Sequence, residues 1–151
     1  GYTSYASLND LPTRAPAFAA LAKALDPHIG RFCQQLEFDL GRRRLVLDSL
    51  WINVLEPGGV HPGHIHPQSV LSGTVYLAVP PGAAGLKLED PRLGLMMAAP
   101  PRKPKAARQA YVTVPAEPGW VTLWESWLRH EVPMNQGEQP RVSVSFNYGW
   151  R

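Results

Sequence analysis

Cysteine and long hydrophobic runs are almost absent from the sequence. Cys33 is the single cysteine, which rules out a disulfide within the chain and fits a reducing compartment. No apolar run approaches the roughly 18 residues that a membrane-spanning helix needs. We therefore expect a cytoplasmic protein with no membrane partner.

The sequence also lacks the pattern of a nucleic-acid-binding protein, although its formal net charge is +3. The basic residues fall into two short clusters, Arg42–Arg44 and a second one between Arg102 and Arg108. No aromatic residue lies among them as a surface on which bases could stack. A solvated turn and a loop account for both clusters, and the alternative is a small anionic substrate attracted by their charge. No nucleic-acid partner is expected.

The chain is expected to form one domain, residues 1–151, because its length suffices for a single hydrophobic core. Residues 1–40 have a helical pattern, since apolar side chains recur every three or four positions, as at Leu21 and Leu25. Pro27 is suited to the first turn of a helix. The pattern therefore predicts two helices, the second of which begins at Pro27.

Residues 44–150 have a different pattern, that of short strands separated by Pro and Gly. Apolar Leu50 and Ile52 alternate with Trp51 and Asn53 along one of them, as expected for a strand with two unlike faces. The expected strands are Leu45–Leu55, Val70–Val79, Leu86–Leu88, Tyr111–Val114, Trp120–Trp124 and Arg141–Tyr148. Helices followed by regularly spaced strands predict a mainly β fold, a sandwich or jelly-roll with the helices outside. Trp51, Trp124 and Trp127 are expected in the core.

The segment Ala98–Ala110 interrupts this series of strands. It is rich in Pro, Ala and basic residues and has no periodicity. Long segments of this kind often cover functional sites. We expect a mobile loop near the mouth of a pocket.

His64 and His66 are candidate metal ligands because side chains two residues apart on an extended strand point to the same side. Imidazole is a suitable ligand for iron, zinc, copper and nickel. His-x-His alone is equally typical of a surface or core pair, but this one directly precedes a predicted strand. His61 would face the other way on a regular strand, and the Pro-Gly pair that follows it leaves its direction open.

His130 is followed, eleven residues later, by Arg141 and a strand with one polar face. Its two faces are Val142, Val144 and Phe146 on one side, and Arg141, Ser143, Ser145 and Asn147 on the other. A polar row on a strand rich in core-forming residues predicts either a cavity wall or a solvent-facing surface. In a cavity, the arginine could bind a carboxylate through two parallel hydrogen bonds.

From about Trp51 to Trp150 the sequence resembles the iron(II)- and 2-oxoglutarate-dependent oxygenases, most closely a bacterial and phage group of them. The resemblance is carried by Trp51-Ile52-Asn53, His64-Ile65-His66-Pro67, Ser72-Gly73-Thr74-Val75-Tyr76, Glu89-Asp90-Pro91-Arg92, Gly119–Trp124, His130 and Arg141–Asn147. It implies a double-stranded β-helix, the jelly-roll also found in cupins. It further implies oxidative decarboxylation of 2-oxoglutarate, coupled with O2 to hydroxylation or a related C–H oxidation of an unidentified small molecule or peptide.

The resemblance implies that His64 and His130 ligate Fe(II) and that Arg141 and Ser143 bind the far carboxylate of 2-oxoglutarate. His66 departs from the family pattern, which has a carboxylate at that position. Either His66 itself completes a three-histidine catalytic site, or the site has lost its iron chemistry. The remaining candidates for a carboxylate ligand are Glu89, Asp90, Glu125 and Glu131.

Asn53 and Tyr76 belong to strands that flank the expected site. Both are candidates for hydrogen bonds to the co-substrate, and packing is the alternative role for each. Two other functions remain open: a cupin-like three-histidine dioxygenase that needs no 2-oxoglutarate, and a non-enzymatic jelly-roll that binds a metabolite. The oligomeric state is open as well, with a homodimer as one option.

Overall fold

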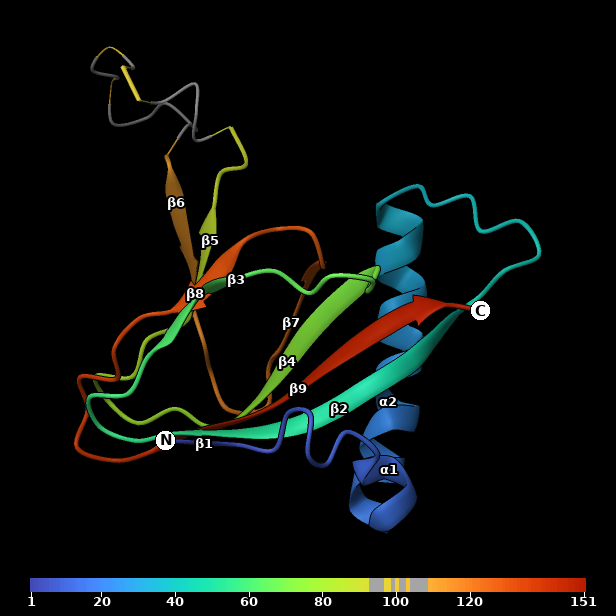
Figure 1. Ribbon diagram of the computed structural model, residues 1–151, viewed down its shortest axis with the longest axis horizontal. Coiled ribbons are helices and arrows are strands. Elements are labelled where there is room, and N and C mark those ends of the chain that lie inside the picture. The colour runs from blue at the N-terminus through green and yellow to red at the C-terminus, as the bar shows by residue number, and fades with distance from the viewer. Residues whose placement is uncertain (93–96, 99, 101–102, 104–108) are drawn as a thin grey trace.

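The computed structural model describes residues 1–92, 97–98, 100, 103 and 109–151, and its strands form two antiparallel sheets (Figure 1). The larger sheet has the order β1 (Tyr2–Thr3), β2 (Leu45–Leu55), β9 (Arg141–Trp150), β4 (Leu71–Ala78), β7 (Val121–Glu125). The smaller sheet has the order β3 (His61–His64), β8 (His130–Val132), β5 (Leu86–Glu89), β6 (Tyr111–Val114). The predicted fold class, mainly β with N-terminal helices outside the sheets, is confirmed.

The larger sheet has two unlike faces because side chains alternate along its strands. On β2, β9 and β4, Ile52 is paired with Val144 and Val144 with Val75. These apolar residues belong to the cluster packed against the helices. Asn53 and Ser143, which are paired one position along, line a cavity on the opposite side of the sheet. The alternation predicted for the two longest strands is therefore observed.

The helices α1 (Leu11–Arg14) and α2 (Pro16–Gln35) cover the apolar face of the larger sheet (Figure 1). Leu25, Ile29 and Cys33 follow one another at four-residue steps along α2, and all three are buried. They share a core cluster with Phe146 and Tyr148 of β9. Within the described residues, no helix is long and apolar enough to cross a membrane.

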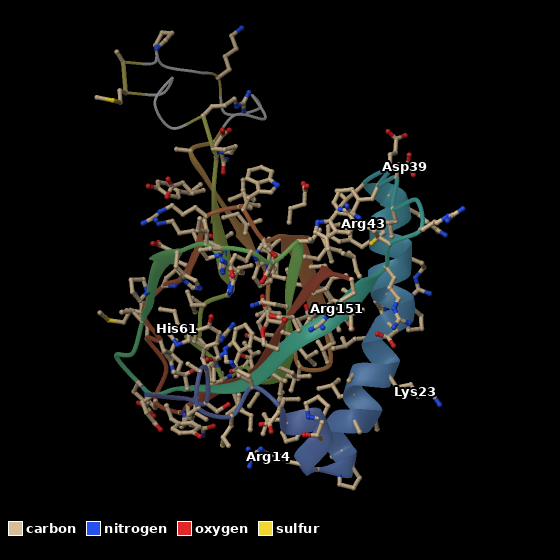
Figure 2. The ribbon with its side chains drawn as sticks, turned by 45° about the vertical axis from the view of Figure 1, so that its right-hand side comes forward. Arg14, Lys23, Asp39, Arg43, His61 and Arg151 are labelled. Carbon is tan, nitrogen blue, oxygen red and sulfur yellow. The ribbon has the colours of Figure 1, made fainter. Side chains whose placement is uncertain are left out.

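The prediction that a second helix begins at Pro27 is wrong, because α2 continues through this residue. Proline has no N–H to donate to the preceding turn, and inside a helix it costs roughly 3 kcal/mol. Leu25 and Ile29, buried on the same face of the helix, each contribute roughly 1.5–3 kcal/mol. Together they outweigh the proline. Figure 2 shows Lys23 on the opposite side of α2, pointing away from the sheet.

The six strands expected from the sequence are all present, with bounds that differ by at most a few residues. Three strands were missed: β1, β3 and β8. They have two to four residues each, too few to show an alternating pattern, and β3 contains both Pro62 and Gly63. Most of the segment Ala98–Ala110, predicted to be a mobile loop, lies outside the described residues.

Tyr148 joins the sheet to α2. The residue is 1% exposed, and its hydroxyl donates a hydrogen bond to Asp26 Oδ1 at 2.9 Å. Burial raises the pKa of Tyr148 above its ordinary value of about 10, and the bond to Asp26 raises it further. The folded protein therefore keeps this proton at a pH where the unfolded chain has lost it. This part of the stability is complete below about pH 10 and is lost as the pH rises further.

We predict that Tyr148→Phe lowers the free energy of unfolding at pH 7 by about 1 kcal/mol, because one intramolecular hydrogen bond is lost. Above about pH 10, the stability of the variant should fall less steeply than that of the parent protein. Urea unfolding at a series of pH values measures both effects. Tyr111→Phe, at an exposed tyrosine, is the control and should change neither. An unchanged pH profile in Tyr148→Phe would contradict the prediction.

Candidate metal centre

Three histidines from two parts of the chain meet between the sheets. His64 ends β3 and His130 begins β8, and the two are paired in the smaller sheet. His66 lies two residues beyond β3, where its backbone N–H donates to the carbonyl of Ser126 at 3.1 Å. The structure thus brings the three predicted ligands together. His66, however, lies after β3. The alternation that predicted its direction requires a position on the strand.

The three rings are close enough to share one ion. One nitrogen of each ring lies within 4.8 Å of the others, and the Nε2 atoms of His66 and His130 are 3.2 Å apart. Two nitrogens bound to one ion at roughly 2.1 Å, with perpendicular bonds, would be about 3 Å apart. Three imidazoles also leave coordination positions for smaller ligands, as in a catalytic metal site.

Backbone carbonyls determine which nitrogen is free in two of the rings. His64 Nδ1 lies 2.8 Å from the carbonyl of Pro62, and His130 Nδ1 lies 2.9 Å from that of Leu128. Since a carbonyl only accepts, the proton of each neutral ring is on Nδ1 and the lone pair is on Nε2. This arrangement orients a ring for metal binding through Nε2.

Burial also favours the neutral form of two of the rings. It lowers the pKa of His66 to about 4, with positive charge on His130 and His64 as further causes. It likewise lowers the pKa of His130 to about 4; the hydrogen bond to Leu128 opposes this shift, and charge on His64 and His61 reinforces it. Both rings are neutral at pH 7, so a metal ion need not compete with a proton for them.

Two indole rings enclose the histidines. The ring centre of Trp51 is 5.8 Å from that of His66, and the ring centre of Trp124 is 4.7 Å from that of His130. Trp51 and Trp124 are buried, as expected, and they also form walls of the cavity. The same expectation is wrong for Trp127, which is 54% exposed in the turn after β7.

A cavity of about 250 Å³ extends from the histidines to the polar face of the larger sheet. Arg141, Ser143 and Ser145 of β9 line it. Asn53 of β2 lines it too, accepting a hydrogen bond from Thr3 at 2.8 Å and donating one to Ser145 at 3.0 Å. Of the two readings that the sequence left open for this row, a cavity wall is the one observed.

Arg141 has the features of an anion-binding residue. It is 2% exposed, its Nη1 donates to Ser143 Oγ at 3.3 Å, and its Nε has no hydrogen-bond partner. Burial lowers its pKa, but a guanidinium stays charged at any physiological pH. Among the described residues, no carboxylate forms an ion pair with it. A buried cation without a partner is costly, so this end of the cavity fits a ligand carboxylate.

Tyr76 lies next to Arg141, with its ring centre 5.0 Å from the guanidinium carbon. It is fully buried, and its hydroxyl has no hydrogen-bond partner among the described residues. Unlike Asn53, it does not belong to the cavity lining. The observed contact is with the arginine, which the ring flanks.

The four carboxylates considered as alternative ligands do not join the histidines. Glu89 is paired with Arg129 at 3.1 Å, Asp90 with Arg92 at 2.6 Å and Glu131 with Lys87 at 2.7 Å. Glu125, the fourth, lies outside the cluster of potential ligands in the described part of the chain. The donor set that the structure offers is therefore three imidazoles.

The structure adds cavity residues that the sequence did not identify. His61 lines the cavity because the register of β3 and β8 shifts between His61 and His64, at Pro62-Gly63. Thr3 and Tyr5 of the N-terminal segment line it as well, and the Tyr5 ring lies 4.9 Å from Trp51, edge-on. The irregular Pro-Gly pair was a signal for His61. Nothing in the sequence indicated the N-terminal segment.

Residues 49–147, well over half of the chain, match the family model described as "Putative 2OG-Fe(II) oxygenase". The chain belongs to this family of oxygenases. The resemblance inferred from the motifs is confirmed, and the family's own description contains the two expected cofactors, iron(II) and 2-oxoglutarate. No curated protein matches the sequence.

Solved structures similar to this oxygenase support the jelly-roll fold. SnoN, an α-ketoglutarate-dependent epimerase from nogalamycin biosynthesis, is 21% identical with a TM-score of 0.66; the match covers 93% of this chain and 59% of SnoN. HygX from Streptomyces hygroscopicus, solved with nickel and 2-oxoglutarate, is 18% identical with a TM-score of 0.62, covering 93% and 70%. A Pseudomonas putida prolyl-4-hydroxylase is 18% identical with a TM-score of 0.58, covering 89% and 68%. The chain thus spans less than two thirds of SnoN.

We predict that the protein binds one divalent ion per chain through His64, His66 and His130. Anaerobic Fe(II) titration, followed by metal analysis of the desalted protein, should give one equivalent. Substituting alanine for any of the three should lower the metal content sharply, because two neutral imidazoles remain. His61→Ala removes a cavity histidine outside the trio and should retain the metal. Equal metal content in His61→Ala and the three ligand variants would contradict the assignment.

Proposed function

We propose that this protein couples the oxidative decarboxylation of 2-oxoglutarate to hydroxylation, or a related C–H oxidation, of a small-molecule or peptide substrate. His64, His66 and His130 hold Fe(II), and Arg141 with Ser143 binds the far carboxylate of 2-oxoglutarate. Family membership supports the cofactors. The observation that carries the proposal is the buried Arg141, which has no ion pair among the described residues and lies in the same cavity as the histidines.

The buried arginine favours this reaction over a three-histidine dioxygenase that needs no 2-oxoglutarate. A metal trio alone would serve either enzyme. The cost of burying a guanidinium is offset only if an anion enters the cavity, and a planar carboxylate matches the paired donors of arginine. Ser143, already within 3.3 Å of Nη1, offers its hydroxyl proton as a further donor. The cavity is therefore suited to a ligand that carries a carboxylate at its Arg141 end.

Charge balance explains how a site without a carboxylate ligand can serve this reaction. Three neutral imidazoles leave a ferrous site at +2, which one 2-oxoglutarate dianion neutralises. A carboxylate ligand would leave the same complex at −1. The three-histidine site should consequently bind the anionic co-substrate well, while it holds the metal itself less tightly.

The remaining cavity residues orient the reactants and exclude water. When bound, iron and 2-oxoglutarate supply the oxidising chemistry with O2. The protein's own contribution is the orientation of the imidazoles by Pro62 and Leu128 and the walls formed by Trp51 and Trp124. These walls surround the ligand trio with apolar surface, which strengthens the electrostatic interactions inside the cavity.

We predict that Arg141→Ala weakens 2-oxoglutarate binding by roughly 30-fold or more. Loss of a buried charge-assisted pair costs on the order of 2–5 kcal/mol, and 1.4 kcal/mol corresponds to about tenfold. Arg141→Lys should recover only part of this loss, since an ammonium group cannot form two parallel bonds. Anaerobic calorimetry of 2-oxoglutarate binding to the Fe(II)-loaded protein measures the effect.

Metal affinity without 2-oxoglutarate is the control and should barely change in either variant, because Arg141 does not belong to the trio. Succinate formation by the wild-type protein, measured across a library of metabolites and peptides, tests the reaction and identifies the substrate. If Arg141→Ala binds 2-oxoglutarate as the wild-type protein does, the co-substrate assignment is wrong. Oxygen uptake without 2-oxoglutarate would then support the cupin-like dioxygenase, and absence of bound metal would support a binding protein.

A further inference from the structure

The residues that line the cavity differ in how far they are exposed to solvent. Among the described lining residues, Thr3, Tyr5 and Ile65 are exposed, with Tyr5 at 50% and Ile65 at 45%. Arg141 and Ser143, which also line the cavity, are 2% and 1% exposed. The exposed fractions therefore separate a mouth, formed by Thr3, Tyr5 and Ile65, from a closed end at Arg141.

The mouth lies beside the three histidines. Ile65 is the residue between His64 and His66 in the sequence. The Tyr5 ring meets the Trp51 ring edge-on, with 4.9 Å between the ring centres, and the centre of the Trp51 ring is 5.8 Å from that of His66. Two ring contacts thus connect the mouth with a proposed ligand. A molecule held at the mouth is next to the trio, whereas the carboxylate site at Arg141 is at the closed end.

The turn that contains Tyr5 is fixed by its neighbours on both sides. Ser4 is buried; its N–H donates to the carbonyl of Ile52 at 3.0 Å, and its hydroxyl accepts from the N–H of Ile52 at 2.9 Å. Ala6 has a φ of 63°, in the left-handed region that residues other than glycine rarely adopt. Unfavourable backbone conformations of this kind are concentrated at binding sites. The position of the Tyr5 ring is therefore built into the fold.

The charges of the lining are all of one sign. Its ionisable members among the described residues are four histidines and Arg141, and none of them is a carboxylate. In the proposed function, the charges of the ion and of the 2-oxoglutarate dianion cancel, so that the charge of the guanidinium remains. A cationic group at the mouth finds no counter-charge in this lining. The cavity thus selects against a positively charged substrate.

We propose that Tyr5 and Ile65 determine the specificity for the primary substrate, which carries an aromatic ring beside the carbon that is oxidised and has no positive charge. The substrate ring packs against Tyr5 and Ile65, and contact between aromatic rings adds to the effect of the buried area. The inference rests on the proposed function, since it places 2-oxoglutarate at the Arg141 end. It adds the class of the substrate and the residues that select it.

Methyl NMR tests the mouth directly, because the chain has three isoleucines. Ile65 lies at the mouth, whereas Ile29 and Ile52 belong to the core on the helix side of the larger sheet. The probe is phenylacetamide, a neutral aromatic molecule, titrated into carbon-13-labelled protein loaded with 2-oxoglutarate and Zn(II), a diamagnetic substitute for Fe(II). The ring current of the probe should shift the methyl signal of Ile65 and leave the other two unchanged. An Ile65 signal that does not move would overturn the inference.

Two related probes test the chemistry of the substrate. Cyclohexylacetamide keeps the amide and the size of the ring but is not aromatic, and it should bind roughly 2- to 12-fold more weakly than phenylacetamide. Phenethylamine keeps the aromatic ring but is positively charged at pH 7, and it should also bind more weakly. Dissociation constants that are the same for all three probes would contradict the proposed substrate class.

Substitution of Tyr5 provides the second arm. Tyr5→Leu keeps an apolar side chain without the ring and should weaken phenylacetamide binding by roughly 2- to 12-fold. Tyr5→Phe keeps the ring and should bind the probe as the wild-type protein does. Tyr2→Leu is the matched control, because Tyr2 is 52% exposed on β1 and lies outside the described cavity lining. This variant should bind phenylacetamide normally.

The outcomes separate the two proposals. If the Zn(II)-loaded protein does not bind 2-oxoglutarate in calorimetry, the proposed function fails and this inference fails with it. If 2-oxoglutarate binds but Tyr5→Leu and Tyr2→Leu have the same affinity for phenylacetamide, only the inference fails. Because Tyr5 is half exposed, its substitution leaves the core intact, and a loss of probe binding is attributable to the mouth.

Discussion

The site depends on the two unlike faces of the larger sheet. A sheet face can be buried only if it is apolar or if its polar groups bond to one another. In β2, β9 and β4, one face meets the first condition and the other face meets the second. Their apolar side packs under α2, and their inner side is a set of short polar side chains that satisfy one another, such as Asn53 with Ser145. Arg141 and Tyr76 are exceptions on this inner face, because Arg141 Nε and the Tyr76 hydroxyl have no hydrogen-bond partner among the described residues.

The smaller sheet contributes His64 and His130 to the cavity that this polar face lines. β3 and β8 are short, and their irregular pairing places His64 opposite His130, whose ring lies against Trp124 of the larger sheet. His66 comes from the connection between the two sheets. The Arg141 end of the cavity therefore lies on a central strand of one sheet, and the histidine end lies where the two sheets meet.

The sequence predicted what depends on regular alternation. The polar row of β9 and the two faces of β2 follow from a period of two, and the resemblance added the pairing of His130 with the His-x-His motif. Where tertiary contacts override local pattern, the sequence was less informative. Packing carried α2 through Pro27, a register shift turned His61 into the cavity, and the contact of Asn147 with His66 spans a sequence separation of 81 residues. The path of α2, the register of β3 and the contact of Asn147 depend on residues distant in the sequence, which no local pattern reveals.

The placement of His66 would give an ion bound by the three histidines a mechanical role as well. The backbone of His66 is held by Ser126, the residue after β7 of the larger sheet, whereas His64 and His130 belong to the smaller sheet. An ion bound by all three would act as a cross-link between the two layers. By mass action it would add about 2.7 kcal/mol to the stability at a hundredfold excess over its dissociation constant. Separation of the layers and release of the ion would then be a single event.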